Sequence, residues 1–233
     1  GVGCHVGCVF IGCIMYADDL ILMSPSINGL QRMLDVCSFY GQSHSMQFNP
    51  SKSVTLCVGR RIREHKCLTI DNKPMQWMNH VKYLRVVFNV KSCLEVDVLH
   101  IKKRFYAALN SIMCRCGNLA EPVKLQLVQS FCLPILVYCI GAVDISSSLL
   151  NELSVCWNNV FRKIFRFNMW DSVKELQLFC GFLDFKHMYD VYRYKFLFNI
   201  CIKLPFLSEF FTTIEMEHHT IVHLLHKYSC VHT

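Results

Sequence analysis

The pattern of apolar and polar positions divides the chain into two regions of different character. Residues 1–92 alternate short apolar runs with turn residues, which is typical of β-strands and hairpins. Residues 93–233 carry apolar residues at intervals of three and four, the spacing of one face of an α-helix. The pattern therefore predicts an α+β chain, in which a small sheet with one helix precedes an almost wholly helical region.

The first region is expected to contain a buried hairpin, a long helix and further short strands. The apolar runs 9–15 and 20–23 flank a short polar tip, which indicates two paired strands. The other expected elements are a helix at 27–43, a turn at 49–52, a strand at 53–58, a hairpin joining 67–70 to 75–77, and a strand at 81–90.

The second region is expected to form successive amphipathic helices. One apolar stripe begins at Val98 and ends near Gly117, a suitable helix C-cap. One further helix is expected to begin at Glu121-Pro122, and another contains the apolar stripe 149–164. A third is expected to begin in a capping box at Ser172–Glu175, and a fourth spans 185–202.

The amino-acid composition excludes some classes of protein and favours others. Hydrophobic residues make up 53% of the 233 positions, which excludes a disordered chain. The apolar runs are shorter than the roughly 18 residues that a membrane span needs, so no membrane partner is expected. With 24 basic and 17 acidic residues the net charge is +7, which favours an anionic partner such as nucleic acid.

The 15 cysteines indicate a reducing, intracellular location, nuclear or cytoplasmic, because they are odd in number and scattered through apolar segments. Most of them are expected to be small core residues. A secretory leader is not expected, since no basic segment precedes the first apolar stretch. The first residue is Gly1 and not Met, which suggests that the chain is cut from a longer one.

The candidate chemistry lies at the tip of the first hairpin. Asp18 and Asp19 are adjacent carboxylates between apolar strands, and two like charges held close and partly desolvated are costly unless a cation neutralises them. Oxygen ligands suit Mg²⁺, which commonly takes one or two carboxylates together with substrate phosphates. The alternative is a polar turn without a ligand, because Asp is a common turn residue.

The segment Tyr16-Ala17-Asp18-Asp19 between apolar strands resembles the catalytic hairpin of reverse transcriptases, in particular those of non-LTR (LINE-type, jockey- or CR1-like) retrotransposons. Two further segments resemble that family in the same order: Asn49–Ser53 is similar to its Asn-x-x-Lys-Ser/Thr turn, and Val81–Phe88 to its Tyr-Leu-Gly strand. The resemblance implies a partial palm at 1–92, a helical thumb at 93–170 and a helical carboxy-terminal extension at 171–233.

By this resemblance the chain is part of an RNA-directed DNA polymerase that uses Mg²⁺, an RNA template, a DNA primer and deoxynucleotides. Asp18 and Asp19 would be catalytic metal ligands. Lys52 would be a general acid for the departing pyrophosphate, and the alternative is a solvated turn lysine. The remaining positions implied to lie near the primer are Tyr16, Ala17, Tyr83 and Leu84.

Two departures from the family lead us to expect no polymerase activity from this chain alone. The family's fingers and a further essential Asp come earlier than its Asp-Asp hairpin, so an upstream polymerase half would be needed as a partner. Arg85 stands where the family usually has Gly, and it adds bulk and removes conformational freedom. Without the earlier strands, the hairpin is also expected to expose an unpaired apolar edge.

Basic helical residues leave two interpretations open. Lys102, Lys103 and Arg104, and the second group at 162–166, could contact phosphates or form solvated helix faces. The second function that we consider is accordingly a non-catalytic nucleic-acid-binding or protein-interaction relic of a retrotransposon. A terminal group of His and Cys at 218–232 is expected to be a frayed helix and not a metal site, because its spacing matches no zinc motif.

Overall fold

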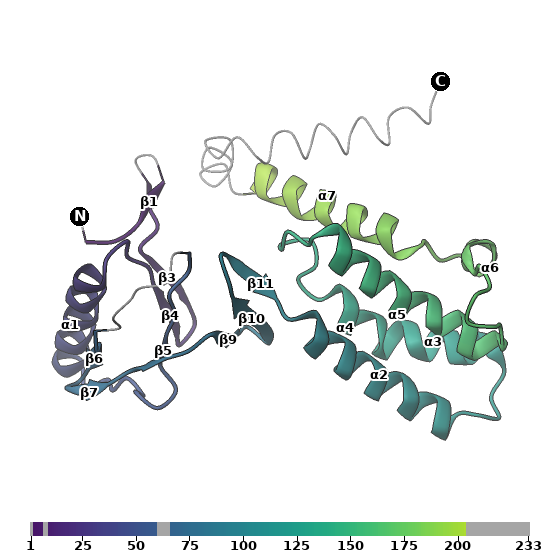
Figure 1. Cartoon of the computed structure of the whole chain (residues 1–233), viewed down its shortest axis with the longest axis horizontal. Helices are drawn as coiled ribbons and strands as arrows, with labels where there is room; N and C mark the ends of the chain where they lie inside the picture. Colours follow the sequence, from purple (N-terminus) through teal and green to yellow (C-terminus); the bar gives the residue numbers. More distant parts are fainter. Residues whose placement is uncertain (1, 7–8, 60–65, 204–233) are drawn as a thin grey trace. The chain divides into compact units, whose positions relative to one another are not determined.

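The computed structural model describes residues 2–6, 9–59 and 66–203. The chain forms two compact units, Gly1–Glu95 and Val96–Thr233, shown in Figure 1. This division lies close to the change of pattern that the sequence shows after residue 92. The first unit mixes strands with one helix and the second is built of helices, so the chain is of mixed helix and sheet content. Its assignment to a palm and a thumb stays a prediction.

The first unit consists of short strands around one long helix. Its elements are β1 (His5–Val6), β2 (Val9–Phe10), β3 (Cys13–Tyr16), β4 (Asp19–Leu22), α1 (Ile27–Ser43), β5 (Val54–Thr55), β6 (Thr69–Ile70), β7 (Lys73–Pro74), β8 (Gln76–Trp77), β9 (His80–Tyr83), β10 (Val86–Val90) and β11 (Leu94–Val96). Antiparallel pairs form β1–β2, β3–β4 and β6–β7, while β5 pairs with β8 in parallel. The strands β11, β10 and β9 form a three-stranded sheet.

Helix α1 has the bounds that the sequence predicts. The side chain of Ser26 accepts a hydrogen bond from the Gly29 backbone N–H at 3.1 Å, so it caps the first turn. The Gln31 side chain donates to the Thr69 carbonyl and accepts from the Thr69 backbone N–H, each at 2.9 Å, which attaches α1 to β6. Buried Leu34 packs with buried Leu68 in the small core of this unit.

The prediction of a single strand over 81–90 is wrong. The structure has an antiparallel hairpin instead, in which Tyr83 pairs with Val86 and the two residues between them turn the chain. Leu84 and Arg85 have φ angles of 44° and 68°, and positive φ at both central residues is the signature of a type I′ turn. The apolar character of the segment concealed this turn, because neither central residue is one of the usual Gly, Asn or Asp.

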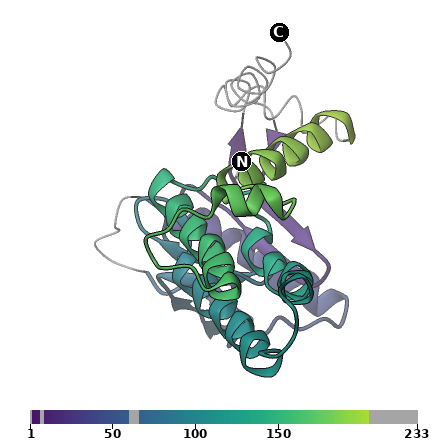
Figure 2. The same cartoon turned by 90° about the vertical axis from the view of Figure 1, so that its right-hand side faces the viewer.

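The second unit is a group of helices that pack side by side, as Figures 1 and 2 show. Its helices are α2 (Val98–Arg115), α3 (Glu121–Phe131), α4 (Leu133–Val137), α5 (Ser147–Phe165), α6 (Lys174–Phe179) and α7 (Phe185–Lys203). The predicted stripes bury their apolar faces here: Phe105 and Leu109 of α2 and Trp157 and Phe161 of α5 are fully buried. Burying these four large side chains stabilises the packing of the two helices.

Two local predictions for the second unit are wrong. The segment at Ser172 does not form a capping box: α6 begins after Val173, and no side chain caps its first turn. The cysteines are also less buried than expected. Cys132 and Cys156 are the buried ones among the described residues, whereas Cys13 is exposed and Cys37 half-buried. Cys13 lies on strand β3, whose residues are all exposed, so an apolar segment did not carry this cysteine into a core.

None of the helices in the part of the chain that the structure describes is long and apolar enough to cross a membrane.

The turn at Arg85 gives a stability prediction. Gly adopts positive φ without the steric cost that a Cβ brings, so Arg85→Gly should raise the free energy of unfolding by about 1 kcal/mol. Arg85→Ala keeps the Cβ and serves as the matched control, for which we expect little change. Urea unfolding followed by circular dichroism measures both, and equal effects of the two substitutions would contradict a strained turn.

Candidate functional site

The structure confirms that the two strands beside the carboxylates pair as an antiparallel hairpin. Tyr16 pairs with Asp19, so Ala17 and Asp18 form a two-residue turn between β3 and β4. Ala17 has a φ of 54°, a conformation that favours glycine. Asp18 therefore lies in the turn itself and Asp19 is the first residue of β4. Both are exposed.

The prediction that this hairpin is buried is wrong. Every residue of β3 is exposed, with Met15 at 74% and Tyr16 at 62% of their full accessibility. Only the β4 side is half-covered, where Leu22 packs against the small core of the first unit. Among the described strands, β3 pairs with β4 and with no other, which confirms the expected exposed apolar edge.

This exposure changes the electrostatic argument for a metal. The sequence suggests that desolvation would force a cation onto Asp18 and Asp19, but both carboxylates meet water and need no counter-ion to be stable. Their oxygens are still the donors that Mg²⁺ prefers. Within the described residues, no group of three or more His, Cys, Asp or Glu could hold a metal. The turn therefore carries two adjacent carboxylates that are exposed to water.

The predicted turn at 49–52 is confirmed. The Asn49 side-chain oxygen accepts from the Ser51 backbone N–H at 3.1 Å, and the Asn49 carbonyl accepts from the N–H groups of Lys52 at 3.1 Å and Ser53 at 3.0 Å. Lys52 is exposed on this turn. In the described parts of the chain no hydrogen bond or ion pair links it to Asp18 or Asp19.

Tyr83 and Leu84 lie at the tip of the β9–β10 hairpin and are half-buried. Tyr83 ends β9, and Leu84 is the first residue of the turn that also holds Arg85. The structure brings these residues together at the tip of one hairpin. The His and Cys residues at 218–232 lie outside the described residues.

The basic residues at 102–104 on α2 differ in their surroundings. The Lys102 ammonium donates a hydrogen bond to the Glu152 carboxylate of α5 at 2.9 Å. This hydrogen bond raises the pKa of Lys102 above its usual 10.5. Lys103 and Arg104 are exposed, and no ion pair involves them within the described residues. Lys102 therefore joins two helices, while its two neighbours face water.

The contact between Lys102 and Glu152 is the first of a series between α2 and α5. The Asn159 amide donates to the Tyr106 hydroxyl at 2.9 Å, one turn further along α2. After another turn, the Lys163 ammonium donates to the Asn110 side-chain oxygen at 2.8 Å. These polar contacts fix the register of the two helices beside their apolar core.

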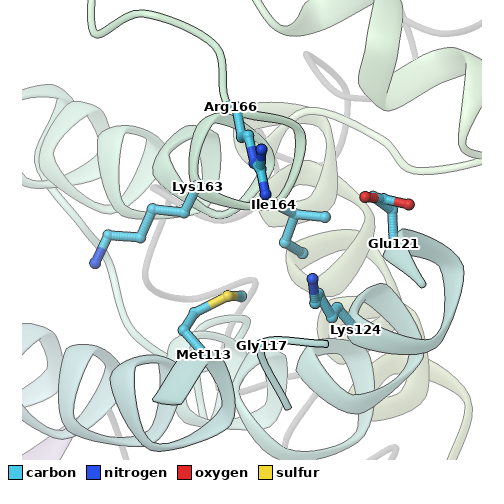
Figure 3. Close-up of a pocket in the computed structure, with 7 residues that line it drawn as sticks. All are labelled: Met113, Gly117, Glu121, Lys124, Lys163, Ile164 and Arg166. Atoms are coloured by element: carbon cyan, nitrogen blue, oxygen red, sulfur yellow. The ribbon is translucent and has the colours of Figure 1, made fainter. Parts of the chain in front are cut away.

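One pocket in the second unit is lined by basic side chains from different helices, and no sequence pattern had linked them. Figure 3 shows Lys124 of α3 and Arg166, which follows α5, directed toward the same opening. Arg166 belongs to the basic group at 162–166, whereas Lys124 is not among the site residues that the sequence predicts. Its only sequence signal is a lysine near the start of a helix, which is too common to select it.

Curated proteins with a related sequence come from retrotransposons. The retrovirus-related Pol polyprotein from the type-1 retrotransposable element R2 of Nasonia vitripennis is 29% identical over 106 residues, which cover 41% of this chain and 10% of that protein. The corresponding R2 protein of Popillia japonica is 25% identical over 167 residues, covering 68% of this chain and 27% of that protein. No family model and no solved structure matches the chain.

These similarities support a relation to non-LTR retrotransposons. The chain spans about a quarter or less of the curated relatives that it matches. Both relatives are R2 proteins, so the jockey- or CR1-like subtype stays a prediction.

The α2–α5 contacts predict a difference between two neighbouring lysines. Lys102→Gln should lower the free energy of unfolding by less than about 1 kcal/mol, because the ion pair is partly exposed and Glu152 loses its partner. The matched substitution Lys103→Gln should leave stability unchanged. Urea unfolding at low salt measures both, and an equal loss would show that Lys102 has no structural role of its own.

The same ion pair should depend on pH in a defined direction. Because the pKa of Lys102 is raised in the folded state, its stabilisation is fully present below its usual 10.5 and is lost as the pH rises above that value. The stability difference between the wild type and Glu152→Gln should therefore disappear in that alkaline range. A difference that persists unchanged there would rule out the charge pair as its cause.

Proposed function

We propose that the chain is a region of a non-LTR retrotransposon reverse transcriptase, an RNA-directed DNA polymerase. The observation that carries the proposal is the β3–β4 hairpin, whose two-residue turn places Asp18 and Asp19 next to each other at its end. A tight turn can direct adjacent side chains to one point, whereas successive residues of an extended strand face opposite ways. The similarity to R2 Pol polyproteins supports the same assignment.

The order of the turns along the first unit agrees with this proposal. The carboxylate turn is followed by the Asn49 turn that carries Lys52, and then by the β9–β10 hairpin with Tyr83 and Leu84 at its tip. These are the segments on which the family resemblance rests. The positive φ of Arg85 also offers a reason for the glycine that the family usually has there, because a type I′ turn favours glycine at that position.

In the proposed reaction Asp18 and Asp19 supply carboxylate ligands to Mg²⁺, which would bind together with substrate phosphates. When bound, Mg²⁺ neutralises phosphate charge and lowers the pKa of the attacking hydroxyl. Tyr16 and Ala17 flank the carboxylates and would lie beside the primer terminus. Tyr83 and Leu84 would support the primer strand, and Lys52 would donate a proton to the leaving pyrophosphate.

We propose further that this chain has no polymerase activity on its own. Two-metal nucleotidyl transfer needs ligands enough to hold two ions in a fixed geometry. The carboxylate turn offers two exposed side chains, and no larger group of metal-ligating residues occurs in the described residues. The exposed edge of β3 is where a strand of another polymerase segment would add.

A second candidate function is a non-catalytic nucleic-acid-binding relic of a retrotransposon. The exposure of Lys103 and Arg104 on α2 favours it, because cations that face water are free to contact phosphates. In the reverse-transcriptase proposal, the same two exposed residues would help to hold a primer–template. The two candidates therefore differ in catalysis and share a nucleic-acid surface.

Primer extension tests the catalytic proposal. The purified chain with Mg²⁺, deoxynucleotides and an RNA template annealed to a DNA primer should give no extension. Addition of an upstream reverse-transcriptase segment from an R2 relative should restore extension, and Asp18→Asn with Asp19→Asn should abolish it. Extension by the chain alone would disprove its inactivity. No extension in the complemented mixture, with the segments shown to associate, would favour the relic.

Nucleic-acid binding by α2 has a separate test. Lys103→Gln with Arg104→Gln should weaken binding to an RNA–DNA duplex and reduce the slope of log K against log salt by about two, since two phosphate contacts are lost. The control Lys186→Gln with Lys195→Gln removes two exposed charges from α7. Fluorescence anisotropy measures both variants, and equal slopes would show that α2 makes no specific phosphate contact.

A further inference from the structure

A pocket of about 310 Å³ opens where the end of α2, the start of α3 and the end of α5 meet. All three helices belong to the second unit, so the pocket is formed within one compact body. The residues that line it are Met113, Gly117, Glu121, Lys124, Lys163, Ile164 and Arg166. Three of these side chains are basic and one is acidic, so the formal charge of the lining is positive.

The three basic side chains are not equivalent. Lys163 donates a hydrogen bond to Asn110 and lies 5.8 Å from the centre of the Tyr106 ring, so its ammonium is held by α2. In Figure 3 it extends away from the other two cations. Lys124 and Arg166 have no ion pair within the described residues, and Glu121 pairs with neither of them. These two cations are therefore available to a ligand.

Backbone geometry places Arg166 over the pocket. It is the C-cap of α5, with φ of 58° and ψ of 36° in the left-handed region, and its N–H bonds to the Arg162 carbonyl. The chain leaves the helix at this residue, and the guanidinium is directed toward the opening that Lys124 enters from α3 (Figure 3). Two cations from different helices thus converge on one space.

Helix electrostatics account for part of this arrangement but not for all of it. A cation at the carboxyl end of α5 is stabilised by the helix dipole, which explains Arg166 without any ligand. Lys124 is the fourth residue of α3, near the amino end, where the dipole disfavours a positive charge. The helix dipole stabilises the negative charge of Glu121 at that end and destabilises the positive charge of Lys124. An anion in the pocket would offset this unfavourable placement.

We propose that Lys124 and Arg166 bind a phosphate group in this pocket. Arg can hold two phosphate oxygens at once through its planar fork, and Lys adds a point charge to a third. For a phosphate in a nucleic-acid backbone the inference rests on the proposed function; for a free phosphate or nucleotide it does not.

Inorganic phosphate is the first probe, used with the full chain. In ¹H–¹⁵N spectra at constant ionic strength, phosphate but not chloride should shift the backbone resonances of Lys124 and Arg166 in a saturable manner. Lys124→Gln with Arg166→Gln should abolish saturation, and the control Lys186→Gln with Lys195→Gln should not. Each variant is accepted only if its remaining spectrum shows a folded second unit.

The second probe is a DNA oligonucleotide that lacks terminal phosphates. If the pocket takes a backbone phosphate, Lys124→Gln with Arg166→Gln should reduce the salt slope of binding by about one to two relative to the control variant. Saturable phosphate binding with an unchanged slope supports the site and assigns it to a free phosphate-bearing ligand. A reduced slope without saturation by inorganic phosphate assigns it to the backbone.

The proposal is overturned if phosphate gives no saturable shift and the salt slope is that of the control. Failure of the proposed function has a different signature: the chain would bind no oligonucleotide at all, while phosphate would still saturate the pocket. Mutation of Lys124 alone gives an independent check. If the pocket binds no anion, Lys124→Gln should stabilise the chain equally with and without phosphate, because it only removes an unfavourable charge from the start of α3.

Discussion

The register between β3 and β4 leaves two residues, Ala17 and Asp18, to reverse the chain. This constraint decides where both carboxylates lie, because a shift by one residue would move every side chain of the hairpin to its other face. Ala17 accepts a positive φ so that the turn can close in two residues. The proposed chemistry depends on that turn, because it places Asp18 and Asp19 at the same end of the β3–β4 hairpin.

The surroundings of the turn limit what it can do. An enclosed carboxylate pair would have to be neutralised by a metal, but an exposed pair is stable in water without one. The two strands of the hairpin pair with each other, and the residues of β3 are exposed to water. The hairpin therefore forms from its own strands, but its carboxylates are not enclosed by other parts of the described chain. This combination is what we expect of a catalytic element that needs further protein around it, and equally of a relic that has lost its catalytic role.

The basic residues of the helical unit serve more than one purpose. Lys102 and Lys163 hold α2 against α5 through Glu152 and Asn110, so their charges are used within the fold. Lys103 and Arg104 face water on α2, and Lys124 and Arg166 converge on the pocket. A count of basic residues would treat all of these alike. Their hydrogen-bond partners separate the ones that stabilise the unit from those able to meet an anion.

The sequence by itself determined the change from strands to helices, the bounds of α1, and the apolar faces of α2 and α5. These follow from short-range spacing, which every turn of helix or pair of strand residues repeats. It also selected the Asp18-Asp19 tip, because two adjacent carboxylates between apolar runs form a local pattern. It predicted no turn at Leu84-Arg85, where the usual turn residues are missing and strand pairing imposes positive φ.

Only the tertiary structure decided which side chains meet. The exposure of the carboxylate hairpin depends on how many strands pair with β3, and spacing along the chain carries no information about that. The pairing of Lys102 with Glu152, and the convergence of Lys124 with Arg166, join residues about forty to fifty positions apart. Such contacts arise from helix packing around Phe105 and Trp157, so they could be known only once the helices were placed together.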